Sequence, residues 1–219
     1  MSKTTFAIIG IIVVIVALGI IFGHKGSQVP PAPTSVVTSA TSTIASTTPL
    51  SATSSATKMY TQATLTTNYG DIVIAFDPKI APKTVENFIT LASKGFYNTT
   101  KFHRVIKGFM IQGGDPLSKD DAQAALWGTG GPGYKFNDEI TPESRNMIGA
   151  VAMANSGPNT NGSQFFINVA NNSFLDGKYS VFAHVTSGLD IVQKISVVST
   201  DPSNDRPLSP VVLESVVLK

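Results

Sequence analysis

The sequence contains no cysteine, which excludes a disulfide-bonded scaffold, a thiolate metal site, a cysteine nucleophile and a cysteine-linked lipoprotein anchor. Charge is almost absent before residue 58, where the only charged side chains are Lys3 and Lys25. The remaining part, residues 58–219, carries fourteen acidic and fourteen basic residues and therefore has no net charge. Because it has no excess of Lys or Arg to neutralise phosphates, we expect no nucleic-acid partner.

The N-terminal residues 6–23 form an uncharged apolar run, FAIIGIIVVIVALGIIFG. As a helix rising about 1.5 Å per residue, this run would extend roughly 27 Å, close to the thickness of a bilayer's hydrocarbon core. A cleavable signal peptide is the alternative, but its apolar region usually has about 7–15 residues. The residues after Phe22 also provide no small-x-small cleavage site. We therefore predict that residues 1–25 are an uncleaved, single-pass transmembrane anchor with short flanks.

The orientation of this anchor and the segment after it set the expected location of the rest of the chain. A short N-terminal tail followed by a large C-terminal domain favours a cytoplasmic N-terminus, which would put the domain outside the cytoplasm at the cell membrane. Residues 26–57 are uncharged, and twenty-five of these thirty-two positions are Ser, Thr, Ala or Pro. With so few large apolar residues to offset the entropy of ordering, this segment is predicted to be a disordered linker, or stalk. Residues 58–219 then form one folded domain.

The folded part is rich in short strand-like segments. Apolar and β-branched residues gather at residues 63–67, 71–76, 102–106, 109–112, 147–154, 164–169, 181–185 and 211–218. A helix is predicted to begin at Pro82 and end near Gly95, and a second, shorter helix to be capped by Ser187. Residues 113–133 are polar and glycine-rich. Many strands and few helices indicate a mostly antiparallel sheet or barrel.

Several common catalytic sites are excluded by context. Residues 128–133 match the pattern G-x-G-x-x-G, but no strand precedes them and no helix pattern follows, so a glycine-rich turn is the better interpretation. No G-x-S-x-G motif of a serine hydrolase occurs. His103 and His184 are the only histidines of the folded part, which does not suit a zinc site with several histidine ligands.

Four segments carry a specific family resemblance. They are FHRVIKGFMIQGGD at residues 102–115, GTGGPGYKFNDE at 128–139, MANSGPNTNGSQFFI at 153–167 and FLDGKYSVF at 174–182. At these residues the sequence resembles the cyclophilin-type peptidyl-prolyl cis-trans isomerases, over about residues 63–219. The resemblance implies a mainly β fold, a closed eight-stranded antiparallel β-barrel capped by two α-helices. It also implies proline-containing polypeptides as partners.

The resemblance further implies a role for each matching residue. Arg104 corresponds to the catalytic arginine and Gln112 to the glutamine that holds it. Asn155 corresponds to the residue whose backbone binds the extended peptide, with Ala154 and Gln164 as further groove walls. The apolar proline pocket would be formed by Phe109, Met110, Phe166 and Leu175.

Two positions depart from the family pattern. Phe174 stands where many members have Trp, and Tyr179 where many have His. Phe174 keeps an apolar wall but lacks the indole N–H donor, which by resemblance supports tight binding of cyclosporin. We therefore expect cyclosporin to bind only weakly, while Tyr179 should still close the pocket.

The residues that the resemblance assigns suit isomerisation of a prolyl peptide bond on physical grounds. Rotation about a peptide bond before proline breaks no bond, so it requires no nucleophile, metal or cofactor. The prolyl nitrogen accepts a hydrogen bond well only when the amide is twisted, so an arginine donor would favour the transition state. The alternatives for these residues are a surface ion pair for Arg104 and ordinary core packing for the apolar side chains.

Two functions remain open from the sequence alone. The first is a membrane-tethered isomerase that assists the folding of exported proteins. The second is a tethered proline-peptide-binding or chaperone module with little turnover, because the effect of Phe174 and Tyr179 on the rate is not fixed by the sequence.

Overall fold

The structure is a computed structural model that describes residues 60–219. The predicted anchor and linker lie outside the described residues. Within the described part of the chain, no helix is both long enough and apolar enough to cross a bilayer.

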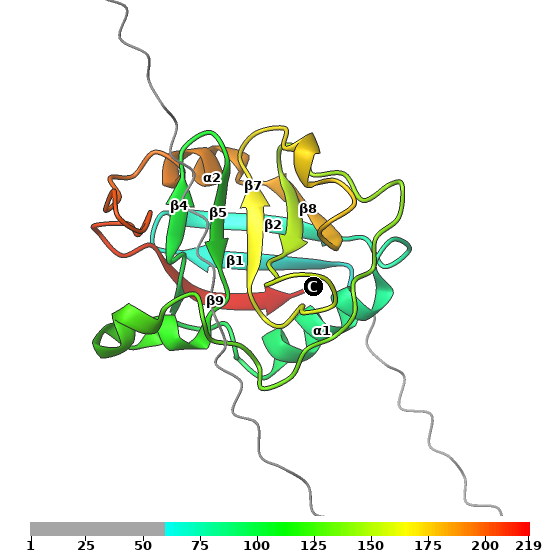
Figure 1. Cartoon of the computed structure of the whole chain (residues 1–219), viewed down its shortest axis with the longest axis horizontal. Helices are drawn as coiled ribbons and strands as arrows, with labels where there is room; N and C mark the ends of the chain where they lie inside the picture. The colour runs from blue at the N-terminus through cyan, green and yellow to red at the C-terminus, as the bar shows by residue number, and fades with distance from the viewer. Residues whose placement is uncertain (1–59) are drawn as a thin grey trace, which may run out of the picture. The chain divides into compact units, whose positions relative to one another are not determined.

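The described residues form nine strands joined in one sheet, and every pairing between neighbouring strands is antiparallel. The order across the sheet is β3-β9-β1-β2-β8-β6-β7-β5-β4. Figure 1 shows the strands of this sheet with α2 above them and α1 below. The strands are β1 (Gln62–Thr67), β2 (Gly70–Phe76), β3 (Thr100–Lys101), β4 (Arg104–Ile106), β5 (Met110–Gly113), β6 (Ala150–Met153), β7 (Phe165–Asn168), β8 (Val181–Ser187) and β9 (Val212–Leu218).

The resemblance implied eight strands in a closed barrel; the structure has nine strands, and the recorded pairings do not confirm closure. The ninth strand is β3, which lies just before the predicted run at residues 102–106 and pairs with β9, whereas β4, within that run, pairs with β5. The recorded pairings run from β3 to β4, and no pairing joins these two ends within residues 60–219. Only Phe102 and His103 separate the two end strands along the chain.

Two α-helices accompany the sheet. Helix α1 (Pro82–Ser93) begins at Pro82, as predicted, and buries one face that contains Val85, Phe88 and Leu91. Its N-terminus has no capping side chain of its own. Instead, the Glu139 carboxylate accepts the backbone N–H groups of Lys83 and Thr84 at 3.1 and 2.8 Å. A distant loop thus completes the helix, which the sequence pattern did not indicate.

Helix α2 (Leu189–Ile195) lies where a second helix was predicted, but its cap is different. Ser187 is the last residue of β8, and Gly188 is the N-cap, with a φ of 81°. A Cβ at Gly188 would collide with the backbone of β2 at Asp71 and lie 3.0 Å from the Ile72 Cα. Glycine is therefore required by both its positive φ and the close approach of two chain segments.

One further sequence expectation needs correction, and the structure adds three 3₁₀-helices. The stretch at residues 113–133 contains two 3₁₀-helices, η1 (Pro116–Lys119) and η2 (Asp121–Leu126), each started by an aspartate side chain that accepts a backbone N–H. The strand expected at residues 147–154 is only Ala150–Met153, and Met147 and Ile148 before it are exposed. A third 3₁₀-helix, η3 (Ser173–Leu175), follows β7.

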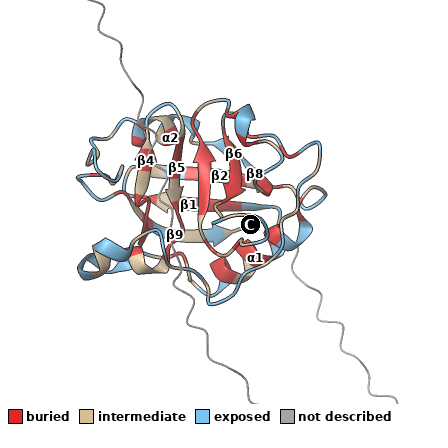
Figure 2. Ribbon diagram, in the orientation of Figure 1, coloured by how far each residue is buried: buried red, intermediate tan, exposed pale blue. Residues whose placement is uncertain are grey.

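The core lies on the inner face of the sheet and is centred on Phe88 of α1. The Phe88 ring contacts Tyr97 at a centroid distance of 4.8 Å and Phe182 at 5.3 Å. It also lies 5.7 Å from Phe165 of β7, almost perpendicular to it. Figure 2 shows buried residues concentrated on the strands, with exposed residues mainly in the loops. This packing fixes the inner face and leaves the outer faces of β4, β5, β6 and β7 available for a site.

Candidate active site

The candidate site begins as a row of side chains across four neighbouring strands. Arg104 of β4 pairs with Gln112 of β5, Gln112 pairs with Phe166 of β7, and Phe166 pairs with Ala152 of β6. Side chains alternate between the two faces along a strand, so paired positions lie on the same face. Directly opposite residues have Cβ atoms roughly 4.5–5.5 Å apart. Sheet register alone therefore places a guanidinium, an amide and an aromatic ring next to one another.

The intervening residues point to the opposite face and belong to the main core. Val105, Ile111, Phe165 and Val151 are all buried there. A second, smaller apolar cluster surrounds the row on the outer face and contains Met110, Ala150, Ala152, Phe166, Leu175 and Val181. The strands therefore hold the site rigidly, because each is fixed from behind by a close-packed core.

A pocket of about 200 Å³ opens over this row, and we call it the apolar pocket after the Met110, Phe166 and Leu175 side chains at its base. Nine of the eleven predicted site residues line it: Arg104, Phe109, Met110, Gln112, Ala154, Asn155, Phe166, Leu175 and Tyr179. Met110, Phe166 and Leu175 are buried and form the apolar part. Tyr179 packs edge-on against Phe166, with ring centroids 5.4 Å apart and planes at 89°. The structure thus brings together residues that lie up to seventy-five positions apart, from 104 to 179.

The other two predicted residues lie beside the apolar pocket. Phe174 is 62% exposed and stacks on Phe109 at a centroid distance of 5.7 Å. It extends the apolar surface outward and does not line the pocket itself. Gln164 lines an adjacent pocket.

Gln112 and Gln164 are joined by a hydrogen bond, and the neighbouring contacts of Gln164 show which side-chain amide donates and which accepts. The Gln164 Nε2 donates to the carbonyl oxygens of Gly128 and Gly130, at 2.9 Å each. The Gln164 Oε1 must then face Gln112, and it accepts from the Gln112 Nε2 at 3.0 Å. Gln112 is left with a carbonyl oxygen able to accept a further donor, either from Arg104 or from a bound peptide.

Arg104 has a different partner from the one implied by the resemblance. Within the described residues, no hydrogen bond joins Gln112 to Arg104; the Arg104 Nε instead forms an ion pair with the Asp205 Oδ2 at 3.4 Å. The two side chains are 42% and 40% exposed. The guanidinium is therefore accessible from the pocket while one of its edges faces a carboxylate.

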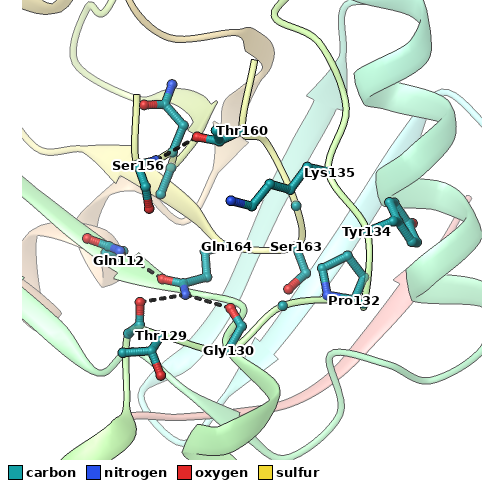
Figure 3. Close-up of a pocket in the computed structure, with 16 residues that line it drawn as sticks. Gln112, Thr129, Gly130, Pro132, Tyr134, Lys135, Ser156, Thr160, Ser163 and Gln164 are labelled. Carbon is teal, nitrogen blue, oxygen red and sulfur yellow. Dashed lines mark hydrogen bonds between the residues drawn. The ribbon is translucent and has the colours of Figure 1, made fainter. Parts of the chain in front are cut away.

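The adjacent pocket, of about 600 Å³, shares Gln112, Ala154 and Asn155 with the apolar pocket. One wall is the glycine loop, which we define as residues 128–133, and the other contains Thr160 and Ser163. Figure 3 shows Gln164 between Gln112 and Gly130, with the Lys135 amine directed toward the pocket and Tyr134 directed away. The two pockets together form a continuous place for an extended chain.

The glycine loop is fixed by Asp115, a fully buried carboxylate. Its Oδ1 accepts from the Leu117 backbone N–H at 2.7 Å, and its Oδ2 accepts from the backbone N–H groups of Gly128 and Gly130. The carbonyl oxygens of the same two glycines accept from the Gln164 Nε2, and Gln164 in turn accepts from Gln112. Asp115 therefore sets the position of Gln112 indirectly. Asp115 is the last residue of the first family segment, 102–115, but its role was not predicted, because its partners lie up to fifteen residues away.

Asn155 offers main-chain groups to a ligand. Its side chain is occupied: the Nδ2 donates to the Lys178 carbonyl, and the Oδ1 accepts the Gly157 N–H. In the described part of the chain, its own backbone N–H and C=O have no recorded protein partner. Exposed, unpaired main-chain groups at the rim of a groove can pair with an extended peptide.

The titratable groups near the site provide no metal centre. His103, next to Arg104, is only 6% exposed, and this burial lowers the pKa of its imidazole below 6.5. Within residues 60–219, no three His, Cys, Asp or Glu side chains gather in a way that could hold a metal ion.

The glycine loop is followed by no helix before β6, which agrees with its interpretation as a turn.

Comparison with known proteins agrees with this geometry. Residues 62–218 match the family model of cyclophilin-type peptidyl-prolyl cis-trans isomerases. The chain is 47% identical over 175 residues to peptidyl-prolyl cis-trans isomerase B of Streptomyces anulatus, covering 72% of this chain and 95% of that protein. It is 46% identical over 148 residues to human peptidyl-prolyl cis-trans isomerase-like 1, covering 67% and 86%.

Solved structures give the same relationship. A cyclophilin-type peptidyl-prolyl cis-trans isomerase of Cryptosporidium parvum is 34% identical, with a TM-score of 0.67, and the match covers 74% of this chain and 98% of that one. The same isomerase, crystallised in the presence of the dipeptide Ala-Pro, matches with a TM-score of 0.66. The family model covers well over half of the chain and agrees with these relatives. The chain therefore belongs to the family of cyclophilin-type peptidyl-prolyl cis-trans isomerases.

Proposed function

We propose that this isomerase accelerates rotation about X-Pro bonds by holding the proline ring in the apolar pocket and directing the Arg104 guanidinium at the prolyl nitrogen. The observation that carries this proposal is the row formed by Arg104, Gln112 and Phe166 beneath that pocket. The row puts a permanently charged donor beside an apolar surface of the size of a small ring.

The donor acts because its target changes during the reaction. Rotation about a peptide bond faces a barrier of about 18–20 kcal/mol, most of which is lost amide resonance. In the twisted amide, the nitrogen recovers a lone pair and can accept a hydrogen bond from Arg104. The planar amide accepts poorly at the same atom. The interaction is therefore stronger in the transition state than in the ground state, which is the condition for raising kcat.

One hydrogen bond is not sufficient for the expected acceleration. Reducing a time of tens of seconds to milliseconds requires a factor of about ten thousand, or roughly 5–6 kcal/mol. A charge-assisted hydrogen bond contributes about 1.5–3 kcal/mol. We assign the remainder to the apolar surface of Met110, Phe166 and Leu175, where the less polar twisted amide loses less solvation than the planar one.

The remaining predicted residues would bind and orient the polypeptide. The backbone of Asn155 would pair with the main chain of an extended segment, and Ala154 would form the groove wall. Phe109 and Tyr179 would close opposite sides of the apolar pocket, while Phe174 would widen its apolar rim. The free carbonyl oxygen of Gln112 would then accept from the guanidinium once a peptide displaces water from the groove.

We also propose that the natural clients are exported proteins, with the domain held at the membrane by residues 1–25. The support is the apolar run in the sequence, followed by a long uncharged segment able to act as a tether. In intact cells, added protease should remove the isomerase domain from the outer surface. Full protection of the domain, with cleavage restored by lysis, would contradict this orientation.

The experiment that tests the proposed activity is NMR exchange spectroscopy on a short peptide with one X-Pro bond. Catalysed exchange between the cis and trans signals at substoichiometric enzyme supports fast isomerisation. Chemical shift changes that report binding, without faster exchange, would instead support a tethered peptide-binding module.

A further inference from the structure

We propose that Asp205 is a positioning residue for Arg104: its carboxylate holds the Nε edge of the guanidinium so that the other nitrogens face the bound prolyl peptide. This inference rests on the proposed role of Arg104 in the reaction. It adds a residue from the loop before β9, which the sequence motifs did not include.

The contact itself is specific to one edge of the guanidinium. The Asp205 Oδ2 lies 3.4 Å from the Arg104 Nε. No protein acceptor is recorded for the two terminal nitrogens of Arg104 among residues 60–219. Because the guanidinium is planar and rigid, holding the Nε edge also fixes the direction of those two nitrogens.

Asp205 is placed by a loop that is ordered by its own hydrogen bonds. The Asp201 Oδ1 accepts from the backbone N–H and the hydroxyl of Ser203, at 2.8 and 2.7 Å. The Asp201 carbonyl accepts the Asp205 N–H at 2.9 Å, and the Asp201 N–H donates to the Arg206 carbonyl at 2.8 Å. Asp205 itself has a φ of 60°, a left-handed conformation that Asp and Asn tolerate better than other non-glycine residues.

Two further contacts attach this loop to neighbouring parts of the chain. The backbone N–H of Val105, the residue after Arg104, donates to the Asp205 carbonyl at 2.8 Å. On the other side, the Arg206 guanidinium donates to the Ala124 carbonyl and lies 4.6 Å from the centroid of the Trp127 ring. The backbone of Asp205 is therefore held at a set position next to the strand that carries Arg104, which keeps the carboxylate within reach of the guanidinium.

The physical effect of this arrangement is on orientation. An unrestrained arginine side chain has many rotamers, and freezing them when the transition state forms costs free energy. A carboxylate fixed beside the Nε removes part of that freedom before the substrate binds. Since the pair is nearly half-exposed, we expect little effect on folding stability. Catalysis and stability should therefore respond differently to its removal.

The test is the substitution Asp205→Asn, which removes the charge and keeps a residue that tolerates a positive φ. We expect kcat for a short X-Pro peptide, measured by NMR line-shape analysis, to fall about fivefold, which corresponds to roughly 1 kcal/mol. The dissociation constant of the peptide and the thermal unfolding midpoint should stay close to wild type. The matched control is Asp121→Asn, which breaks the Lys101–Asp121 ion pair outside both pockets and should leave kcat unchanged.

A double substitution separates this inference from the proposal on which it rests. In an Arg104→Ala background, Asp205→Asn should produce no further loss, because Asp205 acts through Arg104. Wild-type turnover in Arg104→Ala alone would overturn the proposed role of Arg104. Impaired turnover in Arg104→Ala together with wild-type kcat in Asp205→Asn would overturn only the positioning role, as would additive losses in the double variant.

Ionic strength provides a second readout that requires no folding comparison. Raising the salt concentration from about 0.01 M to about 1 M shortens the screening length from roughly 30 Å to roughly 3 Å, which weakens an exposed ion pair. The kcat of the wild type should fall toward that of Asp205→Asn, and the kcat of the variant should change little. Parallel salt responses of the two proteins would contradict the inference.

Discussion

Replacing Gly130 with alanine should destabilise the domain, although the substitution adds only one methyl group. A Cβ at Gly130 would overlap the carboxylate of Asp115 and lie 2.8 Å from the Cγ of Leu117. The carboxylate cannot move freely, because Asp115 is fully buried and accepts three backbone N–H groups. The glycine loop must therefore shift away from Asp115.

The expected size follows from two contributions. Inserting a methyl group into a closely packed place costs about 1–3 kcal/mol. Weakening the hydrogen bond from the Gly130 N–H to the buried carboxylate, at 3.2 Å, adds about 1 kcal/mol. The free energy of unfolding should thus fall by about 2–4 kcal/mol, which lowers the thermal midpoint of a domain of this size by roughly 4–16 °C.

Gly131→Ala is the matched control, because it changes the next residue of the same loop. A Cβ at Gly131 meets no atom within 4 Å, and neither glycine has a positive φ. Its unfolding free energy, measured by urea denaturation, should stay within about 1 kcal/mol of wild type. Turnover should also fall in Gly130→Ala, since the Gly130 carbonyl holds Gln164 and thereby Gln112. Equal unfolding free energies for the two variants would refute this account of the loop.

Two further predictions concern the site and its surroundings. Phe174→Trp should tighten cyclosporin binding by about tenfold, since the indole supplies a donor that phenylalanine lacks; a nanomolar dissociation constant for the wild type, measured by calorimetry, would contradict the expected weak binding. Burial lowers the pKa of the His103 imidazole below its ordinary value of 6.5. As the pH falls, the imidazole of the unfolded state is therefore protonated before that of the folded state, which favours unfolding. The free energy of unfolding should therefore decrease from about pH 7 to about pH 5 and do so less in His103→Gln; identical slopes in urea titrations would show that burial of this imidazole has no such effect.

The parts of the fold that were predictable from sequence depend on local signals. Strands β1 and β2 were confirmed at the two apolar, β-branched runs 63–67 and 71–76, and they pair as an antiparallel hairpin. Helix α1 was confirmed because Pro82 marks its first turn and its apolar residues follow helical spacing. The pairing of Arg104 with Gln112 is also local, since a tight turn around Gly108 joins β4 to β5.

The parts that were missed depend on contacts between distant segments. No pattern near Asp205 indicates that it will meet Arg104, because the loop that carries it lies just before the last strand. Asp115 ends the first family segment, but only the fold reveals that it holds the glycine loop. Ser187 was predicted as a cap from its residue type, whereas the close approach of β2 selects Gly188.

The most direct test of the mechanism is the turnover of Arg104→Ala on a saturating X-Pro peptide, with Arg145→Ala as a matched control. Arg145 pairs with Asp176 and lines neither pocket, so its removal should leave turnover unchanged. The account predicts that Arg104→Ala reduces kcat at least about tenfold, the effect of roughly 1.4 kcal/mol, while the circular dichroism spectrum and unfolding midpoint stay close to wild type. Wild-type kcat in a folded Arg104→Ala variant would contradict the claim that this guanidinium stabilises the twisted amide.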